Sequence, residues 1–70
     1  MDIKKSDGGI NYLKLRFYRE KMGLSKMGLD KLAGVGARTT HNAEMGKGIT
    51  VATLRKLSEA LGVSPSFFLD

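Results

Sequence analysis

Apolar residues recur at intervals of three and four positions along most of this 70-residue chain, whereas the alternating pattern of a β-strand appears nowhere. The first apolar stripe predicts a helix over residues 11–22, with Asn11 as its N-cap and Gly23 just past its end. A second, short helix is predicted between the N-cap Ser25 and Gly34. The stripes consist of Leu15, Tyr18 and Met22 in the first helix, and Leu29 and Leu32 in the second.

Three further helical segments follow. A third helix is predicted over residues 37–45, before Gly46, and a fourth begins after the N-cap Thr50 and ends at Gly62. The sequence SPSFFL, residues 64–69, adds a last turn, because proline favours the first position of a helix. Ile49, just before the cap, is placed to pack on the fourth helix. The residues assigned to the core by their spacing are Met22, Leu24, Leu54, Leu57 and Leu61.

These segments predict an all-α fold class, a compact bundle of five short helices over residues 11–70. Residues 1–10 are polar, contain a glycine pair and are expected to form a flexible N-terminal arm. Lys4 and Lys5 on this arm either contact an anionic partner or, as the simpler interpretation, contact nothing.

Composition narrows the classes of function. The chain has no cysteine and a single histidine, His41, which excludes disulfides, thiolate zinc sites and multi-histidine metal sites. So small a domain cannot spare a deep substrate cavity, and no nucleophile, base and orienting group recur together, so we expect no enzyme activity, cofactor or small-molecule substrate. The net charge of +5 favours nucleic acid as the partner. Without a membrane-spanning run or a signal-peptide pattern, we expect a cytoplasmic protein.

The stretch LAGVGARTTHNAE, residues 32–44, decides the type of binding. A phosphate loop needs two glycines at a fixed spacing followed by Lys and Ser or Thr, and Gly46-Lys47 is followed by Gly48. A dinucleotide-binding loop needs a preceding strand, but Gly34 and Gly36 follow a helical stripe. A short helix, a glycine-containing turn and a second short, polar helix are typical of a helix-turn-helix, here the second and third helices.

From about Leu15 to Phe68 the chain resembles the phage-repressor and Cro type of helix-turn-helix domain, the λ-repressor-like or Xre family. The residues that carry this resemblance are Arg19, GLS at 23–25, Leu29, LAGV at 32–35, Glu44, GK at 46–47 and ALGVS at 60–64. The resemblance implies a five-helix bundle that binds double-stranded operator DNA, usually as a dimer, and regulates transcription. It also implies a partly buried ion pair between Arg19 and Glu44 that ties the first helix to the third.

Four positions depart from the family pattern. Asp30 stands where a small alanine is usual, and Gly36 stands where a turn usually has a capping serine or threonine. Thr40 and Ala43 replace branched aliphatic residues in the third helix, which shrinks its apolar face. Because an unpaired buried carboxylate is costly, Asp30 should either turn to solvent or find a cation, and we expect it at the solvent-facing rim.

The third helix would place polar side chains in the major groove. Arg38 suits the O6 and N7 acceptors of guanine and Asn42 suits adenine, and both positions read bases in the family that the chain resembles. The candidate base contacts are Ala37, Arg38, His41 and Asn42. The candidate phosphate contacts, which position the protein without reading sequence, are Ser25, Lys26, Thr39 and Lys47.

A homodimer on a twofold site is expected, formed in solution or only on DNA, because one recognition helix covers few base pairs. We expect Phe68 to pack inward and Phe67 or Leu69 to meet the partner. The leading hypothesis is a sequence-specific regulator that acts as a repressor. Two alternatives are an antitoxin that represses its own operon and a protein-interaction module that has lost operator binding.

Overall fold

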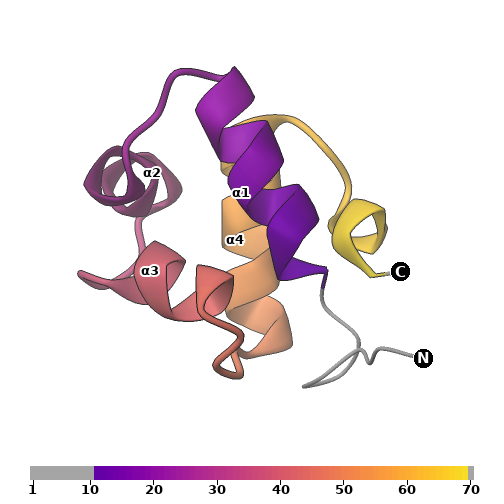
Figure 1. The fold of residues 1–70 in the computed structure, drawn as a ribbon. Coiled ribbons are helices and arrows are strands. Elements are labelled where there is room, and N and C mark those ends of the chain that lie inside the picture. Colours follow the sequence, from indigo (N-terminus) through magenta and orange to yellow (C-terminus); the bar gives the residue numbers. More distant parts are fainter. Residues whose placement is uncertain (1–10, 70) are drawn as a thin grey trace.

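The computed structural model describes residues 11–69, which fold into four α-helices and a closing 3₁₀ turn, with no strand among them (Figure 1). The elements are α1 (Tyr12–Lys21), α2 (Lys26–Ala33), α3 (Thr39–Glu44), α4 (Val51–Leu61) and η1 (Pro65–Phe68). The all-α class is therefore confirmed, while the last of the five predicted helices is a 3₁₀ turn. The predicted N-terminal arm, residues 1–10, lies outside the described residues.

Local capping explains where three of the helices begin. The side chains of Asn11, Ser25 and Thr50 accept hydrogen bonds from the backbone N–H three residues later, at 3.0, 2.9 and 3.1 Å. Gly34 and Gly62 adopt left-handed backbone conformations directly after α2 and α4, which ends both helices. These five positions are the caps and stops that the sequence predicts.

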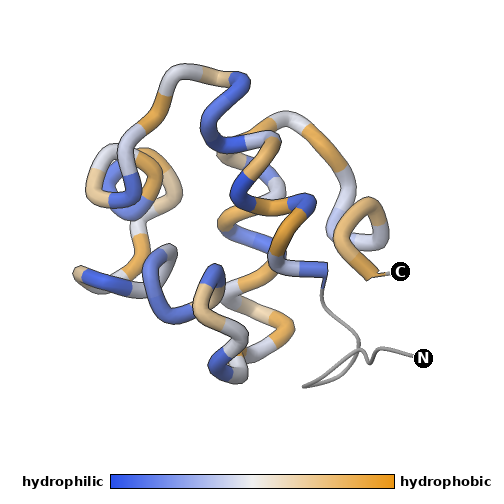
Figure 2. The backbone as a smooth tube through the Cα atoms, viewed as in Figure 1, coloured by the Kyte–Doolittle hydropathy of each residue, from blue (hydrophilic) through white to orange (hydrophobic). Residues whose placement is uncertain are grey.

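The core lies where α1, α2, α3, α4 and η1 meet, and every element contributes to it. In Figure 1, α2 and α3 lie together on one side, and η1 closes the other. The tube coloured by hydropathy shows hydrophilic residues along much of α3 (Figure 2). The buried apolar residues are Leu15, Leu29, Ala43, Leu54, Leu57, Leu61 and Phe68.

Two predicted apolar positions are not in the core. Met22 is 50% exposed because it lies beyond the last turn of α1, as its C-cap. Leu32 is 59% exposed, since the buried face of α2 is centred between Leu29 and Asp30 and Leu32 falls outside it. Leu24 and Ile49 are partly buried and pack against the core cluster.

The prediction that Asp30 faces solvent is wrong. Its side chain is buried, with the residue 4% exposed, and its carboxylate accepts hydrogen bonds from the backbone N–H groups of Arg38, at 2.9 Å, and Thr40, at 2.8 Å. These N–H groups belong to the start of α3, which begins at Thr39, later than predicted. Burial of Asp30 is tolerated because the carboxylate is paired with two donors.

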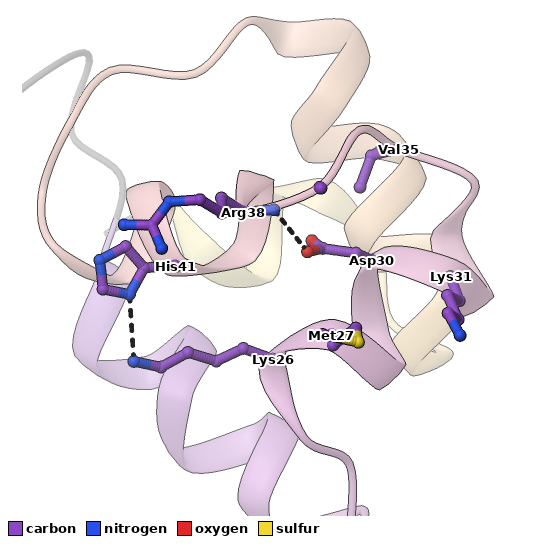
Figure 3. Close-up of a pocket in the computed structure, with 8 residues that line it drawn as sticks. Lys26, Met27, Asp30, Lys31, Val35, Arg38 and His41 are labelled. Atoms are coloured by element: carbon purple, nitrogen blue, oxygen red, sulfur yellow. Dashed lines mark hydrogen bonds between the residues drawn. The ribbon is translucent and has the colours of Figure 1, made fainter.

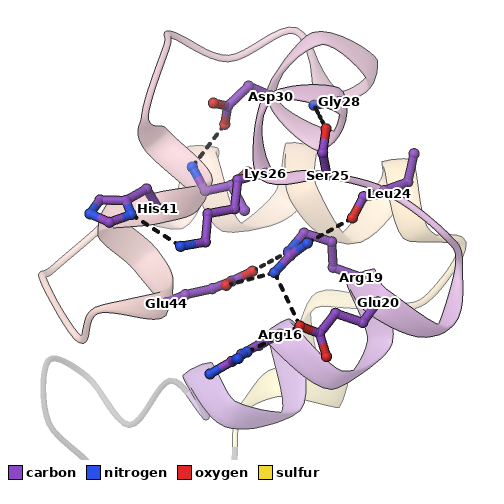
Figure 4. Close-up of polar contacts among 11 residues, drawn as sticks. Arg16, Arg19, Glu20, Leu24, Ser25, Lys26, Gly28, Asp30, His41 and Glu44 are labelled. Carbon is purple, nitrogen blue, oxygen red and sulfur yellow. Dashed lines mark hydrogen bonds and ion pairs between the residues drawn. The ribbon is translucent and has the colours of Figure 1, made fainter.

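The C-terminal end of α3 is held from α1. The Arg19 guanidinium donates to both carboxylate oxygens of Glu44, at 2.5 and 3.1 Å, and to the carbonyl oxygen of Leu24 at 2.7 Å (Figure 4). The side chains of Arg19 and Glu44 are only 7% and 4% exposed. The hydrogen bond to Glu44 raises the pKa of Arg19 above its ordinary value, against the opposing effect of burial.

The closing turn η1 is fastened to α1. Asn11 N–H donates to the carbonyl oxygen of Phe68 at 2.6 Å, and Lys14 Nζ donates to that of Phe67 at 3.0 Å. The rings of Tyr18 and Phe67 meet edge to face, with centroids 5.1 Å apart. Phe68 is completely buried, as predicted, and anchors η1 in the core.

Thr40 provides a test of packing beneath α3. It is completely buried, and among the described residues its Oγ1 is the one buried side-chain polar atom without a hydrogen-bond partner. Thr40→Val removes this hydroxyl with little change of shape, so we expect the free energy of unfolding to rise by about 1 kcal/mol. Urea denaturation measures the change.

Thr53→Val is the matched control for this prediction. The Thr53 hydroxyl accepts a hydrogen bond from Thr50 Oγ1 at 3.0 Å, so its loss is expected to lower stability slightly or leave it unchanged. If Thr40→Val lowers the free energy of unfolding, as Thr53→Val is allowed to do, the Thr40 hydroxyl is not unsatisfied and the prediction is wrong.

Candidate nucleic-acid interface

The N-terminal end of α2 and the outer side of α3 form one surface. Ser25 and Lys26 are exposed at the start of α2. Lys26 Nζ lies 3.3 Å from His41 Nδ1 on α3 (Figure 3). The turn between the two helices carries Ala37 and Arg38 to the same edge, and both are exposed. The structure thus brings candidate phosphate contacts on α2 and candidate base contacts on α3 and the preceding turn onto one surface.

The two sides of α3 differ as expected from its sequence. Thr40 and Ala43 face the core, at 0% and 3% exposed. His41 and Asn42 are partly exposed. Ala37 and Arg38 precede the helix, rather than forming its first turn, because α3 begins at Thr39. The remaining candidate phosphate contacts lie at its two ends, with Thr39 partly exposed and Lys47 exposed.

Arg38 has an unusual backbone. It is the N-cap of α3 with φ of +68°, and it is the one non-glycine residue with positive φ among residues 11–69. L-amino acids with a Cβ rarely adopt this conformation. Its own side chain makes no capping hydrogen bond, so the guanidinium is not occupied at the helix start.

Two hollows adjoin α3. The first, of about 410 Å³, lies between α2 and the start of α3, and it is lined by Lys26, Met27, Asp30, Lys31, Val35, Ala37, Arg38 and His41 (Figure 3). The second, of about 580 Å³, is lined by Thr39, Asn42, Gly48, Ile49, Thr50 and Thr53. The outer residues of α3 therefore stand on a ridge with space on both sides, a shape that suits insertion into a groove.

The charge of this surface is positive because its acidic groups are turned inward. Asp30 and Glu44 are both engaged in hydrogen bonds beneath the surface. Desolvation, followed by the charges of Arg38, Lys26 and Lys47, lowers the pKa of His41 below its ordinary value. A neutral His41 accepts a hydrogen bond from Lys26 through Nδ1, and the lysines and Arg38 remain as donors to an anion.

Sequence reasoning missed two residues of this surface and misplaced a third. Met27 and Lys31 line the first hollow, but neither belongs to a motif that marks it out. Asp30 was assigned to solvent, although the missing side chain at Gly36 signals that the start of α3 needs a cap from elsewhere.

The candidate dimer contacts lie at η1, away from α3 (Figure 1). Phe67 is partly buried against Tyr18, whereas Leu69 is 48% exposed. Sequence reasoning did not single out Leu13 and Phe17, which are 68% and 64% exposed on α1.

Neither a metal centre nor a membrane span is found in the part of the chain that the structure describes. Across residues 11–69, no three His, Cys, Asp or Glu side chains are grouped so that they would hold a metal ion. The helices of this region are all too short or too polar to cross a membrane.

Comparison with known proteins identifies the family. The model of the helix-turn-helix family HTH_3 matches residues 15–68. The hypothetical transcription factor NHTF from Neisseria has a similar structure, with a TM-score of 0.80 at 20% identity over 100% of this chain and 86% of that chain, a likeness of fold alone. No curated protein matches the sequence.

A second solved structure is similar in sequence as well as in fold. The HTH_3 family transcriptional regulator from Vibrio cholerae has a TM-score of 0.75 and 31% identity over 87% of this chain, which spans 35% of that protein's chain. The family model begins within α1 and spans α2, α3, α4 and η1 completely. The chain therefore belongs to the HTH_3 helix-turn-helix family, of the λ-repressor-like type that its sequence resembles.

Proposed function

We propose that this domain binds double-stranded DNA with α3 in the major groove and represses transcription from a twofold operator. The observation that carries the proposal is the sorting of charge around α3, where the carboxylates of Asp30 and Glu44 are buried and basic side chains remain outside. Such a surface attracts the phosphate backbone. Membership of the HTH_3 family and the similarity to the HTH_3 family transcriptional regulator from Vibrio cholerae support the same function.

Base reading is assigned to residues on the outer side of α3 and the turn before it. Arg38 is exposed and its guanidinium makes no capping bond, so its forked donors are available to guanine O6 and N7. Asn42 lines the second hollow, where its amide suits adenine. His41 and Ala37 are the remaining proposed base contacts, beside Arg38 along the first hollow.

Phosphate contacts are assigned to both flanks. Ser25 and Lys26 stand at the N-terminus of α2, whose backbone donors and positive dipole end favour a phosphate. Thr39 and Lys47 stand at the two ends of α3. These groups fix the position of the domain on the duplex without reading its sequence.

A second candidate function is that of a protein-interaction module that has kept the fold but lost operator binding. The exposed Leu13 and Phe17 on α1 favour it, because large apolar side chains at neighbouring helical positions suit a protein partner. The two candidates differ in a titration with random duplex DNA at low and high salt. A domain without operator binding shows neither appreciable affinity nor a salt dependence.

Substitutions at Arg38 and Lys47 are expected to separate base reading from phosphate contact. Arg38→Ala should cost about 1–3 kcal/mol on the selected site and much less on a scrambled duplex, and Asn42→Ala should behave likewise. Lys47→Ala should weaken both duplexes similarly and reduce the salt slope by about one unit. Binding is measured at several salt concentrations. Equal losses on both duplexes for Arg38→Ala and Asn42→Ala would exclude α3 as the recognition helix.

His41 gives the proposal a pH dependence. Its lowered pKa leaves it largely neutral in the free domain at neutral pH, while nearby phosphates favour the charged form, so binding takes up a proton. Because the pKa of His41 is then higher in the DNA complex than in the free domain, binding becomes stronger as the pH falls. We expect affinity to rise between about pH 8 and pH 5.5, and His41→Gln to remove that rise. The same pH profile in both proteins would place His41 away from the DNA.

The proposed dimer is tested on a palindromic site. Two domains should bind with half-site centres about 34 Å apart, one turn of DNA. Leu69→Ser should weaken the second binding event more than the first, because Leu69 is the more exposed of the two candidate contacts. Sedimentation of the complex gives the stoichiometry. Strictly one-to-one binding at saturating protein would refute the dimer.

A further inference from the structure

Asp30 holds both ends of the turn between α2 and α3. Its backbone carbonyl accepts hydrogen bonds from Gly34 N–H and from Val35 N–H, the latter at 3.1 Å, which ends α2. Its carboxylate accepts the N–H groups of Arg38 and Thr40, at 2.9 and 2.8 Å, which begins α3 (Figures 3 and 4). One residue therefore fixes where the recognition helix starts and how it leaves α2.

No other group in the described turn can do this. Gly36 has no side chain, and the side chain of Arg38 makes no capping bond. Arg38 also adopts φ of +68°, which L residues with a Cβ rarely adopt without external support. The two hydrogen bonds of Asp30 supply that support on either side of Thr39, from a carboxylate that is 4% exposed.

We propose that Asp30 is a positioning residue for DNA recognition, an inference that rests on the proposed function. Its buried carboxylate touches no base. It determines the direction in which the Arg38 side chain leaves the turn, and hence how well the guanidinium meets a guanine. A bidentate contact depends strongly on direction, whereas a lysine–phosphate contact tolerates displacement. Asp30 therefore governs discrimination between sequences rather than affinity for DNA in general.

Asp30→Ala separates these two quantities. The ratio of dissociation constants for scrambled and selected duplexes should fall about tenfold, the effect of one lost bidentate contact. Affinity for the scrambled duplex should stay unchanged or rise slightly, because a negative charge has been removed from a basic surface. Glu59→Ala is the matched control, since it removes an exposed carboxylate from α4 and should leave the ratio unchanged.

Gly36→Ser supplies a local replacement for the carboxylate. A Cβ at position 36 would lie 3.7 Å from Thr39 Oγ1, an ordinary contact, and Gly36 is not in the left-handed region. The serine hydroxyl would stand where it can accept from the first turn of α3. The double variant Asp30→Ala/Gly36→Ser should regain most of the discrimination that Asp30→Ala loses.

The experiment begins with selection of bound sites from a random DNA pool by the wild-type protein. Failure to select any site refutes the proposed function. Hydrogen exchange without DNA still tests the clamp in that case, since the amides of Arg38 and Thr40 should exchange faster in Asp30→Ala than in Glu59→Ala. If Asp30→Ala does not fold, Asp30→Asn takes its place, because it retains one acceptor oxygen. Its ratio of dissociation constants for scrambled and selected duplexes should fall, but by less than the change expected for Asp30→Ala.

Two results would overturn the role of Asp30 while leaving the proposed function intact. One is a folded Asp30→Ala, or Asp30→Asn in its place, with the full wild-type ratio. The other is an Asp30→Ala/Gly36→Ser variant that regains the melting temperature of the wild type but not its ratio of dissociation constants. That result would mean that Asp30 has only a structural role.

Discussion

The structure depends on holding a six-residue helix in one orientation. α3 is too short to be stable alone, since isolated helices need roughly 12–15 residues even in favourable sequences. Its buried residues, Thr40 and Ala43, are small, so apolar burial contributes little. Instead, Asp30 binds the backbone at its start and Arg19 binds Glu44 at its end. Directional polar bonds from α2 and α1 therefore place the candidate recognition helix.

This arrangement also determines the charge of the surface. The chain has seven acidic residues against twelve lysines and arginines, and two of the carboxylates are withdrawn into the interface beneath α3. Each is satisfied by two donors, which offsets much of the cost of removing a carboxylate from water. The same bonds that orient α3 thus leave the outer face to Lys26, Arg38 and Lys47.

The features that the sequence alone predicts well are local. Side-chain caps and left-handed glycines act within three or four residues, so Asn11, Ser25 and Thr50 mark the starts of α1, α2 and α4 correctly. The helix-turn-helix is also predicted well, because the residues that mark it in the family have a fixed spacing along the chain. The cap of α3 comes from a side chain eight residues away, at Asp30, and the helix starts later than its apolar pattern indicates. A tertiary contact of this kind leaves no periodic pattern in the sequence from which it could be predicted.

A helix held by polar bonds has a different balance of properties from one held by an apolar face. Apolar burial is non-directional and adds stability in proportion to area, whereas two hydrogen bonds to one carboxylate fix an angle and add little net free energy. The unpartnered hydroxyl of Thr40 lowers stability further without altering that angle. A ligand that binds only the folded state adds to its stability, so DNA bound along α3 would offset this deficit. The small residues beneath α3 are therefore compatible with recognition, provided that the two carboxylates keep its direction.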